Sequence, residues 1–478
     1  MTTNRFEPHV WRIAAVVVVG AVMSILDTTI VNVALETLGR DLHSSLADIQ
    51  WVATGYMLAL AAVIPVSGWA AGRFGAKRLW LASVVLFTLG SALCGMAWST
   101  GSLIAFRVLQ GVGGGMIMPI GQMVLTRAVG PARLGRVMSV VGLAMILAPI
   151  FGPTIGGLMI DHLDWRWIFY VNVPVGVIGL IMGARMLPSV EDGVEATRLD
   201  RVGLALLSVG VPLVVYGLAE FGDHGTLTAA QAYLPLLVGI ALVVAFALHA
   251  LRVAEPLLNI RLFREPSFGA AALTTFVLGA GLFGAMIVMP LYFQLVRGED
   301  AVTTGLLLIP QGVGAAIAMP LAGSLSDRLG GGRVALAGLA VTLVTTIPFV
   351  ALGATTSYAL IGAAMIGRGF GIGLTMMPAM TAAYGRLETA DIAHATPQLN
   401  VLQRVGGSIG IALLTVVLQH GLTGAHTPDA AASAFGQTYL WVLGLTVVAA
   451  IPAYVLARAE RSHPKATAPI AAPAEAAA

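Results

Sequence analysis

Two charged side chains lie within stretches of sequence that are otherwise apolar enough to cross a membrane. Asp27 is inside the apolar stretch from Ile13 to Leu35, and Arg107 is inside a later stretch, 102–126. At ~1.5 Å of helix per residue, Asp27 lies about 21 Å from the start of its stretch, within a hydrocarbon core ~30 Å thick. A charge at this depth is costly unless it is neutralised, paired or hydrated, so each of the two needs a partner or a function.

Each charge has two interpretations. Asp27 is either a site for a proton or ion, or a packing acid that a hydrogen bond keeps neutral. Intramembrane acids usually mark ion pathways, which favours the first interpretation. Arg107 either meets a counter-charge or a water-filled cavity, or extends its head group to the outer surface, which is about 9 Å away at helical rise. The functional role is the preferred interpretation of Arg107.

The composition predicts the class of protein around these charges. Of 478 residues, 58% are hydrophobic and 10% are charged, with a mean hydropathy of +0.89. Soluble domains carry about 25% charged residues. Long apolar runs with short loops, and without the alternation of a β-barrel, indicate membrane-spanning helices. One cysteine, Cys94, excludes an internal disulfide and a cysteine-built metal site, and no cofactor is expected.

Runs long enough to cross a bilayer predict an all-α polytopic fold with fourteen spans. They are expected near 11–37, 47–71, 79–98, 102–126, 134–160, 166–187, 202–221, 231–252, 267–296, 303–326, 333–354, 357–384, 392–420 and 436–458. The first run is too long for a cleaved signal and is expected to remain a span. Most lysines and arginines then fall on one side, which predicts that both termini are cytoplasmic.

An internal repeat divides the chain. Pro65, Gly68, Arg73 and Gly75 recur 255 positions later as Pro320, Gly323, Arg328 and Gly330, and Gly152 and Gly156 recur after 254 as Gly406 and Gly410. The repeat predicts two six-span halves with the transport path between them. The expected divisions are an N-terminal bundle at 1–188, linkers with two inserted spans at 189–266, a C-terminal bundle at 267–460 and a disordered tail at 461–478.

Several motifs resemble those of the fourteen-span drug:proton antiporters of the major facilitator superfamily, the EmrB/QacA-like group. They follow in the right order over essentially the whole chain, as LDTTIVNVAL at 26–35, GWAAGRFGAKR at 68–78, RVLQGVG at 107–113, APIFGPTIGG at 148–157 and WRWIFYVNVP at 165–174. The resemblance implies that Asp27 is the protonation site and that Arg107 lies beside the first span as its partner. Burial and a nearby guanidinium would then oppose each other in setting how tightly the carboxyl holds its proton.

The second and fourth motifs are identified with gating and packing. The family usually has an aspartate where this chain has Gly72, whereas the second copy of the loop keeps it as Asp327. On physical grounds alone both loops could be positive-inside anchors with glycine turns. The fourth motif, with its kink-forming prolines and close-packing glycines, is the main basis for export rather than uptake. The candidate gating and packing residues are Gly68, Arg73, Gly75, Gly152, Pro153, Gly156, Gly157, Asp327 and Arg328.

Candidate substrate contacts are less specific. Arg368 and Arg404 lie within spans of the second half and could line a cavity or hold the fold. Methionines near residue 376 could form an adaptable wall, although ordinary packing explains each one equally well or better. Glu36, where the family usually has proline, is interpreted as a solvated acid at the end of the first span. The candidate cavity residues are Asn32, Gln110, Met376, Met377, Gln403 and Arg404.

The sequence therefore predicts a non-enzymatic, proton-coupled exporter of amphipathic drugs, antibiotics or dyes, working by alternating access. A dedicated exporter of one endogenous metabolite or lipid is the alternative within transport. A non-transporting membrane sensor or scaffold is the alternative from another class, and the short loops offer it little surface. The expected setting is the bacterial cytoplasmic membrane, as a monomer, with protons, lipid and small amphipaths as partners and no nucleic acid.

Overall fold

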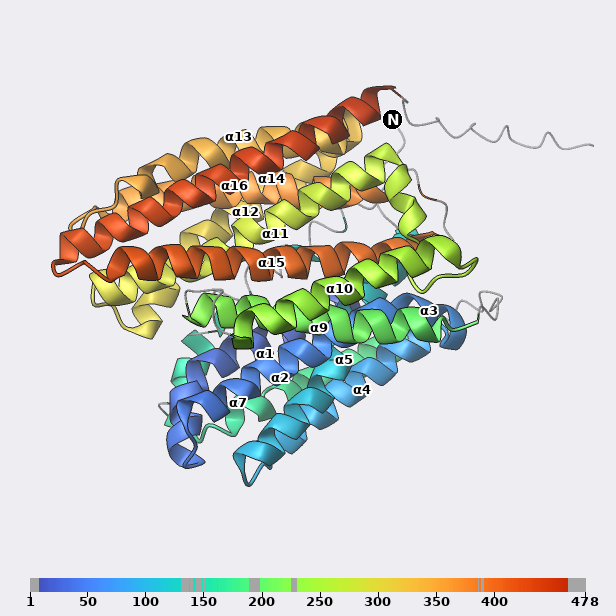
Figure 1. Cartoon of the computed structure of the whole chain (residues 1–478), viewed down its shortest axis with the longest axis horizontal. Coiled ribbons are helices and arrows are strands. Elements are labelled where there is room, and N and C mark those ends of the chain that lie inside the picture. Colours follow the sequence, from blue (N-terminus) through green and yellow to red (C-terminus); the bar gives the residue numbers. More distant parts are fainter. Residues whose placement is uncertain are drawn as a thin grey trace, which may run out of the picture.

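The computed structural model describes residues 8–129, 137, 141–142, 148, 151–152, 154–160, 162–188, 198–224, 230–385, 387 and 391–462. In these residues the chain forms long helices joined by short loops (Figure 1). The helices of the first half are α1 (Pro8–Asp41), α2 (Leu46–Val63), η1 (Ile64–Val66), α3 (Ser67–Phe74), α4 (Ala76–Gly95), α5 (Thr100–Val129), α7 (Trp167–Tyr170) and α8 (Asn172–Met186). The remaining helices are α9 (Arg201–His224), α10 (Ala230–Arg252), η3 (Ile260–Arg264), α11 (Pro266–Leu291), η4 (Tyr292–Val296), α12 (Ala301–Leu329), α13 (Gly331–Val350), α14 (Tyr358–Tyr384), α15 (Ile392–Leu422) and α16 (Pro428–Ser462).

Thirteen helices in the described ranges are long and apolar enough to cross a membrane. They fall at thirteen of the fourteen expected positions, which confirms the all-α polytopic fold. The expected span at 134–160 is described only in parts, and of these 151–152 and 154–160 are helical. The expected span at 47–71 is interrupted by the 3₁₀ turn Ile64–Val66, because Pro65 cannot donate the hydrogen bond that a continuous helix requires.

The ends of two other predicted segments also differ. The last helix begins at Pro428 and continues to Ser462, so it is longer than expected and includes the first two residues of the segment predicted to be a disordered tail. The rest of that tail lies outside the described residues. The expected span at 166–187 is two helices that meet at Val171.

The helices of the second half pack on one another, with α11 against α15 and α16, and α14 against α12 and α13. In the first half, α5 packs between α2 and α4, and α1 contacts α5 and α8. The inserted pair α9–α10 lies across the junction of the two groups (Figure 1), with α9 in contact with both α2 and α15. The proposed boundaries at 188 and 266 stay a prediction.

A buried carboxylate ties the start of α9 to the end of α10. Asp200 accepts hydrogen bonds from the Gly203 and Leu257 amides at 2.8 and 3.1 Å, and its Oδ1 lies 2.8 Å from His249 Nε2. Burial acts to raise the pKa of Asp200, but these hydrogen bonds outweigh it and leave the pKa below its usual value. The inserted pair is therefore held as one unit on the basic side of the molecule.

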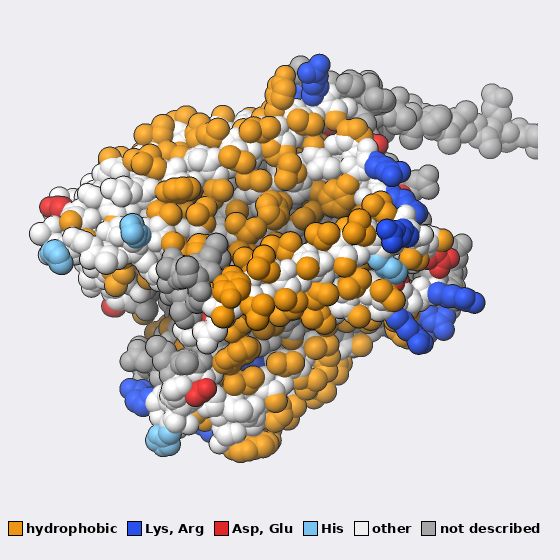
Figure 2. Space-filling view, in the orientation of Figure 1, with side chains coloured by type: hydrophobic (Ala, Val, Ile, Leu, Met, Phe, Trp, Pro, Cys, Tyr) orange, Lys and Arg blue, Asp and Glu red, His pale blue; other side chains and the backbone are white. Residues whose placement is uncertain are grey.

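Contacts between the two halves lie at one end of the long helices that face each other. Gly68 on α3 packs directly on the Ala393 carbonyl oxygen at the start of α15. Asn400 Nδ2 donates to Gln122 Oε1 of α5 at 2.9 Å. Figure 2 shows that most visible lysine and arginine side chains gather at this same end. By the positive-inside rule this is the expected cytoplasmic end, so the structure is closed there.

The predicted gating residues occupy this closed end. Gly75 and Gly330 end α3 and α12 with φ of 85° and 90°, which is the left-handed region that glycine adopts without strain. Arg73 and Arg328 are both exposed. Asp327 lies in the last turn of α12, and its side chain is outside what the structure describes.

Substitution of Gly68 by alanine should disfavour the closed form. Its Cβ would overlap the Ala393 carbonyl, whereas a Cβ on Gly72 would meet nothing within 4 Å. Overpacking costs roughly 1–3 kcal/mol, so the closed population should fall about 5- to 150-fold. Accessibility of a cysteine placed at Ala393 to a thiol reagent should rise in Gly68→Ala and stay at the wild-type level in Gly72→Ala. Equal accessibility in the two variants would contradict the contact.

Candidate functional site

Asp27 is fully buried and accepts three hydrogen bonds from side chains of two other helices. Arg107 Nη1 on α5 donates to Oδ2 at 2.5 Å. Gln110 Nε2, one turn further along α5, and Asn172 Nδ2 at the start of α8 donate to Oδ1 at 2.8 and 2.9 Å. The acid is thus enclosed by groups that neutralise and saturate its carboxylate.

Arg107 is held by further hydrogen bonds and by an aromatic ring. Its Nε donates to the Val52 carbonyl at 3.1 Å, and its Nη1 also donates to Gln110 Oε1 at 2.7 Å. Its guanidinium carbon lies 4.1 Å from the centre of the Tyr56 ring, within cation–π range. Only 1% of the side chain is exposed, so the alternative in which Arg107 reaches to the outer surface is wrong. The counter-charge is close enough to hold the side chain inside the bundle.

The three side chains that hydrogen-bond to Asp27 all donate to it. Both oxygens of Asp27 only accept hydrogen bonds, from a guanidinium and two amides. A protonated carboxyl group would have to donate one. The donors around Asp27 are therefore arranged to suit a carboxylate that accepts from all of them.

A second ring of polar groups supports the first. Asn172 Nδ2 also donates to Ser91 Oγ at 3.1 Å, and Ser91 Oγ donates to the Phe169 carbonyl at 2.9 Å. The hydroxyls of Tyr56 and Ser24 lie 3.2 Å apart. These bonds fix the Asn172 amide and the Tyr56 ring, which are the groups that touch the ion pair directly.

Small residues bring the helices close enough for this network. A Cβ on Gly111 would lie 2.6 Å from the Tyr56 carbonyl oxygen, and one on Gly115 would lie 2.6 Å from the Leu60 carbonyl oxygen. The glycine run of α5 is therefore a packing surface for α2, and not a phosphate-binding loop. Gly152 packs directly on Thr29 of α1, two residues beyond Asp27. A Cβ on Gly156 would lie 3.2 Å from Ile30 of the same helix. The fourth motif thus packs against the helix that carries Asp27.

Two members of that motif add less. A Cβ on Gly157 would meet nothing within 4 Å, so this position is not at a close helix contact. Pro153, the predicted kink, lies outside the described residues. The packing role expected for Gly152 and Gly156 is therefore visible in the structure, whereas the kink stays a prediction.

Sequence reasoning missed three members of the network. Asn172 lies in the motif at 165–174 but was not named as a candidate site residue, and Tyr56 and Ser91 were not singled out. A signal was present for Asn172, because an amide within an apolar span needs a hydrogen-bond partner. Tyr56 and Ser91 gave none, because a hydroxyl can bond to its own helix and therefore needs no distant partner.

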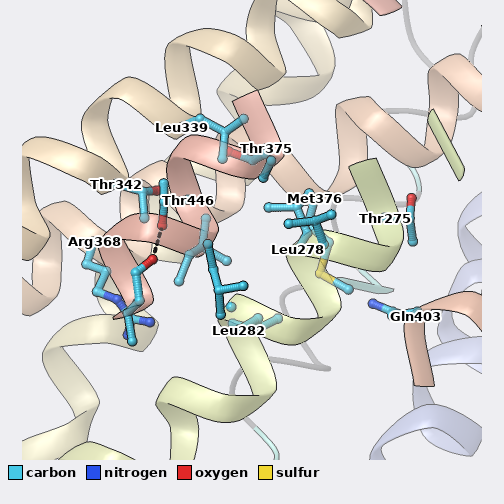
Figure 3. A pocket seen from close by; sticks show the side chains of 16 residues that line it. Thr275, Leu278, Leu282, Leu339, Thr342, Arg368, Thr375, Met376, Gln403 and Thr446 are labelled. Carbon is cyan, nitrogen blue, oxygen red and sulfur yellow. Dashed lines mark hydrogen bonds between the residues drawn. The ribbon is translucent and has the colours of Figure 1, made fainter. Parts of the chain in front are cut away.

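The predicted cavity residues do not form one cavity. Gln110 belongs to the acid network, Asn32 is exposed, and Met377 Cε lies 2.8 Å from where a Gly142 Cβ would be. Met376 and Gln403 line a cavity of about 40 Å³ inside the second half, together with Arg368 (Figure 3). That volume holds roughly three waters at 10–15 Å³ each, which is too small for a drug.

Arg404 has a different environment. It lies one turn beyond Asn400 on α15, and residues four apart share a face of a helix, so it points towards the first half, as the Asn400–Gln122 bond does. Its side chain is exposed, and it lies within electrostatic range of the Tyr56 phenol. Among the described residues no carboxylate forms an ion pair with it. The space between the two halves therefore carries an unpaired positive charge.

Replacing Asn172 by leucine should destabilise the protein. The change removes a donor to Asp27 and leaves an accepting carboxylate oxygen short of a partner, which costs about 1–3 kcal/mol. The matched change Asn32→Leu removes an exposed amide and should stay within about 0.5 kcal/mol. Thermal unfolding of the purified variants in detergent measures both. If the two midpoints fall by the same amount, Asn172 does not hold the acid.

Sequence comparison places these features in a family. A profile of the Major Facilitator Superfamily matches residues 17–411. The "Multidrug resistance protein B homolog" of Mycobacterium tuberculosis is 40% identical over 420 residues, covering 87% of this chain and 78% of that protein. The "Putative multidrug resistance protein MdtD" of Salmonella heidelberg is 29% identical over 450 residues, covering 93% of each chain.

Solved structures agree on the fold. The human organic anion transporter MFSD10 (TETRAN) superposes with a TM-score of 0.65 at 13% identity, covering 92% of this chain and 100% of that one. The proton:xylose symporter XylE gives 0.63 at 13% identity, covering 93% and 94%. At such identity the likeness shows the fold alone. From the profile, the curated relatives and the fold together, this chain belongs to the Major Facilitator Superfamily and is a multi-pass membrane transporter rather than an enzyme.

Proposed function

We propose that the chain is a proton-coupled exporter of amphipathic drugs, antibiotics or dyes. The observation that carries the proposal is the ion pair of Asp27 and Arg107, buried inside one bundle and saturated with hydrogen bonds. A buried ion pair is weak evidence of a role in stability, because well-packed hydrophobic residues in its place often make a protein equally stable. A role in proton coupling, in which Asp27 exchanges the guanidinium of Arg107 for a proton, explains why the pair is buried here.

The proposed coupling uses the two charge states of Asp27. When it is ionised, Arg107, Gln110 and Asn172 hold α1, α5 and α8 together, as in this structure. When a proton binds, the carboxyl must donate a hydrogen bond, so the attraction to Arg107 is lost and the guanidinium turns to other acceptors. The two packings of the bundle then differ in stability, and a proton gradient biases the alternation between them.

The proposed substrate path lies between the two halves, as in other transporters built from repeats. The contacts of Gly68 and Asn400 close this path at the basic end. Arg404 and the exposed Asn32 are the candidate residues on this path, and Tyr56 separates Arg404 from the ion pair. A molecule bound beside Tyr56 could thus affect the position of Arg107 without touching Asp27.

The setting proposed with this function is the cytoplasmic membrane of a bacterium, with both termini in the cytoplasm and the chain acting as a monomer. The multidrug-resistance names of the relatives support export of several compounds. Export of a single endogenous metabolite or lipid is the competing function. A substrate panel in inside-out vesicles separates the two, because a dedicated exporter would accept one chemical group only.

Asp27→Asn should separate proton coupling from substrate exchange. The amide keeps the shape and part of the hydrogen bonding but cannot bind and release a proton. Proteoliposomes with an imposed pH gradient should show uphill substrate accumulation for the wild type and only background for the variant. Substrate exchange at equal pH on both sides should continue in the variant, which shows that it is folded and binds its substrate.

Two outcomes would count against the proposal. Full gradient-driven accumulation by Asp27→Asn would place the coupling site elsewhere. Loss of both accumulation and exchange, with unchanged thermal stability, would make Asp27 a binding residue rather than a coupling residue. Asp164→Asn, at an exposed acid of the loop before α7, is the matched control and should behave as the wild type.

Arg404→Gln should change which amphipaths are transported. The unpaired guanidinium attracts acid-bearing compounds and repels cationic ones, and loss of one hydrated contact worth ~1.4 kcal/mol is about tenfold in affinity. The apparent KM for an anionic dye should therefore rise about tenfold, while that for a cationic dye should stay the same or fall. Parallel shifts for both dyes would show that Arg404 acts on the fold instead.

A further inference from the structure

The second half contains a buried arginine, Arg368, near a position that corresponds to Asp27 but holds no acid. Arg368 lies on α14, the fourth long helix of its half, as Arg107 lies on the fourth of the other. The 255-residue shift of the repeat carries Tyr56 onto Gln311. Arg107 stacks on Tyr56, and Arg368 Nη1 donates to Gln311 Oε1 at 2.9 Å. Around these arginines the matching positions are 258 apart, since Gly111 packs on the Tyr56 carbonyl and Gly369 on the Gln311 carbonyl. Arg368 therefore stands where the first half has Gln110, which donates to Asp27.

The same shift carries Asp27 onto Leu282, on α11. Leu282 lines the small cavity described above, and so does Arg368 (Figure 3). Where the first half has a carboxylate, the second half has a leucine and an internal space of about 40 Å³. The cavity thus lies beside an arginine whose counterpart in the first half, Gln110, donates to a carboxylate.

The positive charge of Arg368 is not neutralised by an acid among the described residues around it. Its side chain is 3% exposed, and its Nε has no hydrogen-bond partner. Of the titratable groups in the described residues, Tyr439 is the one within electrostatic range, and its hydroxyl contacts Met289 Sδ at 3.4 Å, a weak acceptor. The protein leaves a complete positive charge in the membrane interior without an acid.

The other polar groups of the cavity supply no negative charge. The hydroxyls of Thr342, Thr375 and Thr446 donate to main-chain carbonyls of their own helices at 2.8–2.9 Å. Water could solvate the guanidinium but would not neutralise it, and an unpaired buried charge costs several kcal/mol. An ion of opposite sign satisfies both the charge and the free Nε.

We propose that the cavity beside Arg368 binds a small monovalent inorganic anion, chloride being the abundant one, in place of the carboxylate that Asp27 provides in the first half. The volume accommodates an ion of this size but excludes an amphipathic substrate. The anion acts as a permanent counter-ion for the second bundle, so this half stays electrically fixed while the first half titrates. The proposal does not depend on the substrate or on the direction of transport.

Binding of radioactive chloride to the purified full-length protein in detergent tests the proposal directly. The wild type should show saturable binding and a higher unfolding midpoint in potassium chloride than in potassium gluconate of equal ionic strength. Arg368→Gln should lose both effects. The matched change Arg40→Gln, at an exposed arginine, should keep both.

Two substitutions at Leu282 test chloride binding while leaving Arg368 in place. Leu282→Asp places a carboxylate where Asp27 stands in the other half, so it should displace chloride and abolish the difference between the two salts. Leu282→Asn has nearly the same shape without the charge and should still bind chloride. Absence of saturable binding in the wild type, or equal binding in the two Leu282 variants, would overturn the proposal, whether or not Arg368→Gln folds.

Discussion

The buried contact between Asp27 and Arg107 is the constraint on which the first half depends. Removing one partner of such a pair typically costs ~3–5 kcal/mol, because the other charge is left without compensation. Gln110, Asn172 and Tyr56 contact the pair directly, so that both carboxylate oxygens accept hydrogen bonds and the guanidinium lies against an aromatic ring. Arg107, Gln110 and Asn172 thus link α1, α5 and α8 through one carboxylate.

The backbone is adapted to this requirement. Glycines at 111 and 115 let α5 approach α2 closely enough for Arg107 to reach the Val52 carbonyl. Gly68 and the Asn400–Gln122 bond close the far end of the same helices. A local change at the acid is therefore transmitted through tightly packed helices and not through flexible loops.

Much of this could be predicted from the sequence, because a charge among apolar residues must find a partner. Asp27 and Arg107 followed from that rule, and the span positions followed from hydropathy. The uncharged side chains that contact this ion pair could not be predicted in this way. Asn172 and Tyr56 are brought to the pair by tertiary packing, which no local sequence pattern encodes. The six proposed cavity residues were separated for the same reason, since residues such as Met376 and Met377 are adjacent in sequence but point to different neighbours.

The inserted helices have a consequence for how a lipid-soluble molecule can approach. α9 contacts both halves, and α10 lies outside it with only 17% of its apolar segment buried. Together they form a double wall along one flank of the crevice, anchored through Ser208 to the Ala62 carbonyl at 2.7 Å. A compound diffusing within a bilayer leaflet on that flank therefore meets α10 before it meets the junction of the two halves.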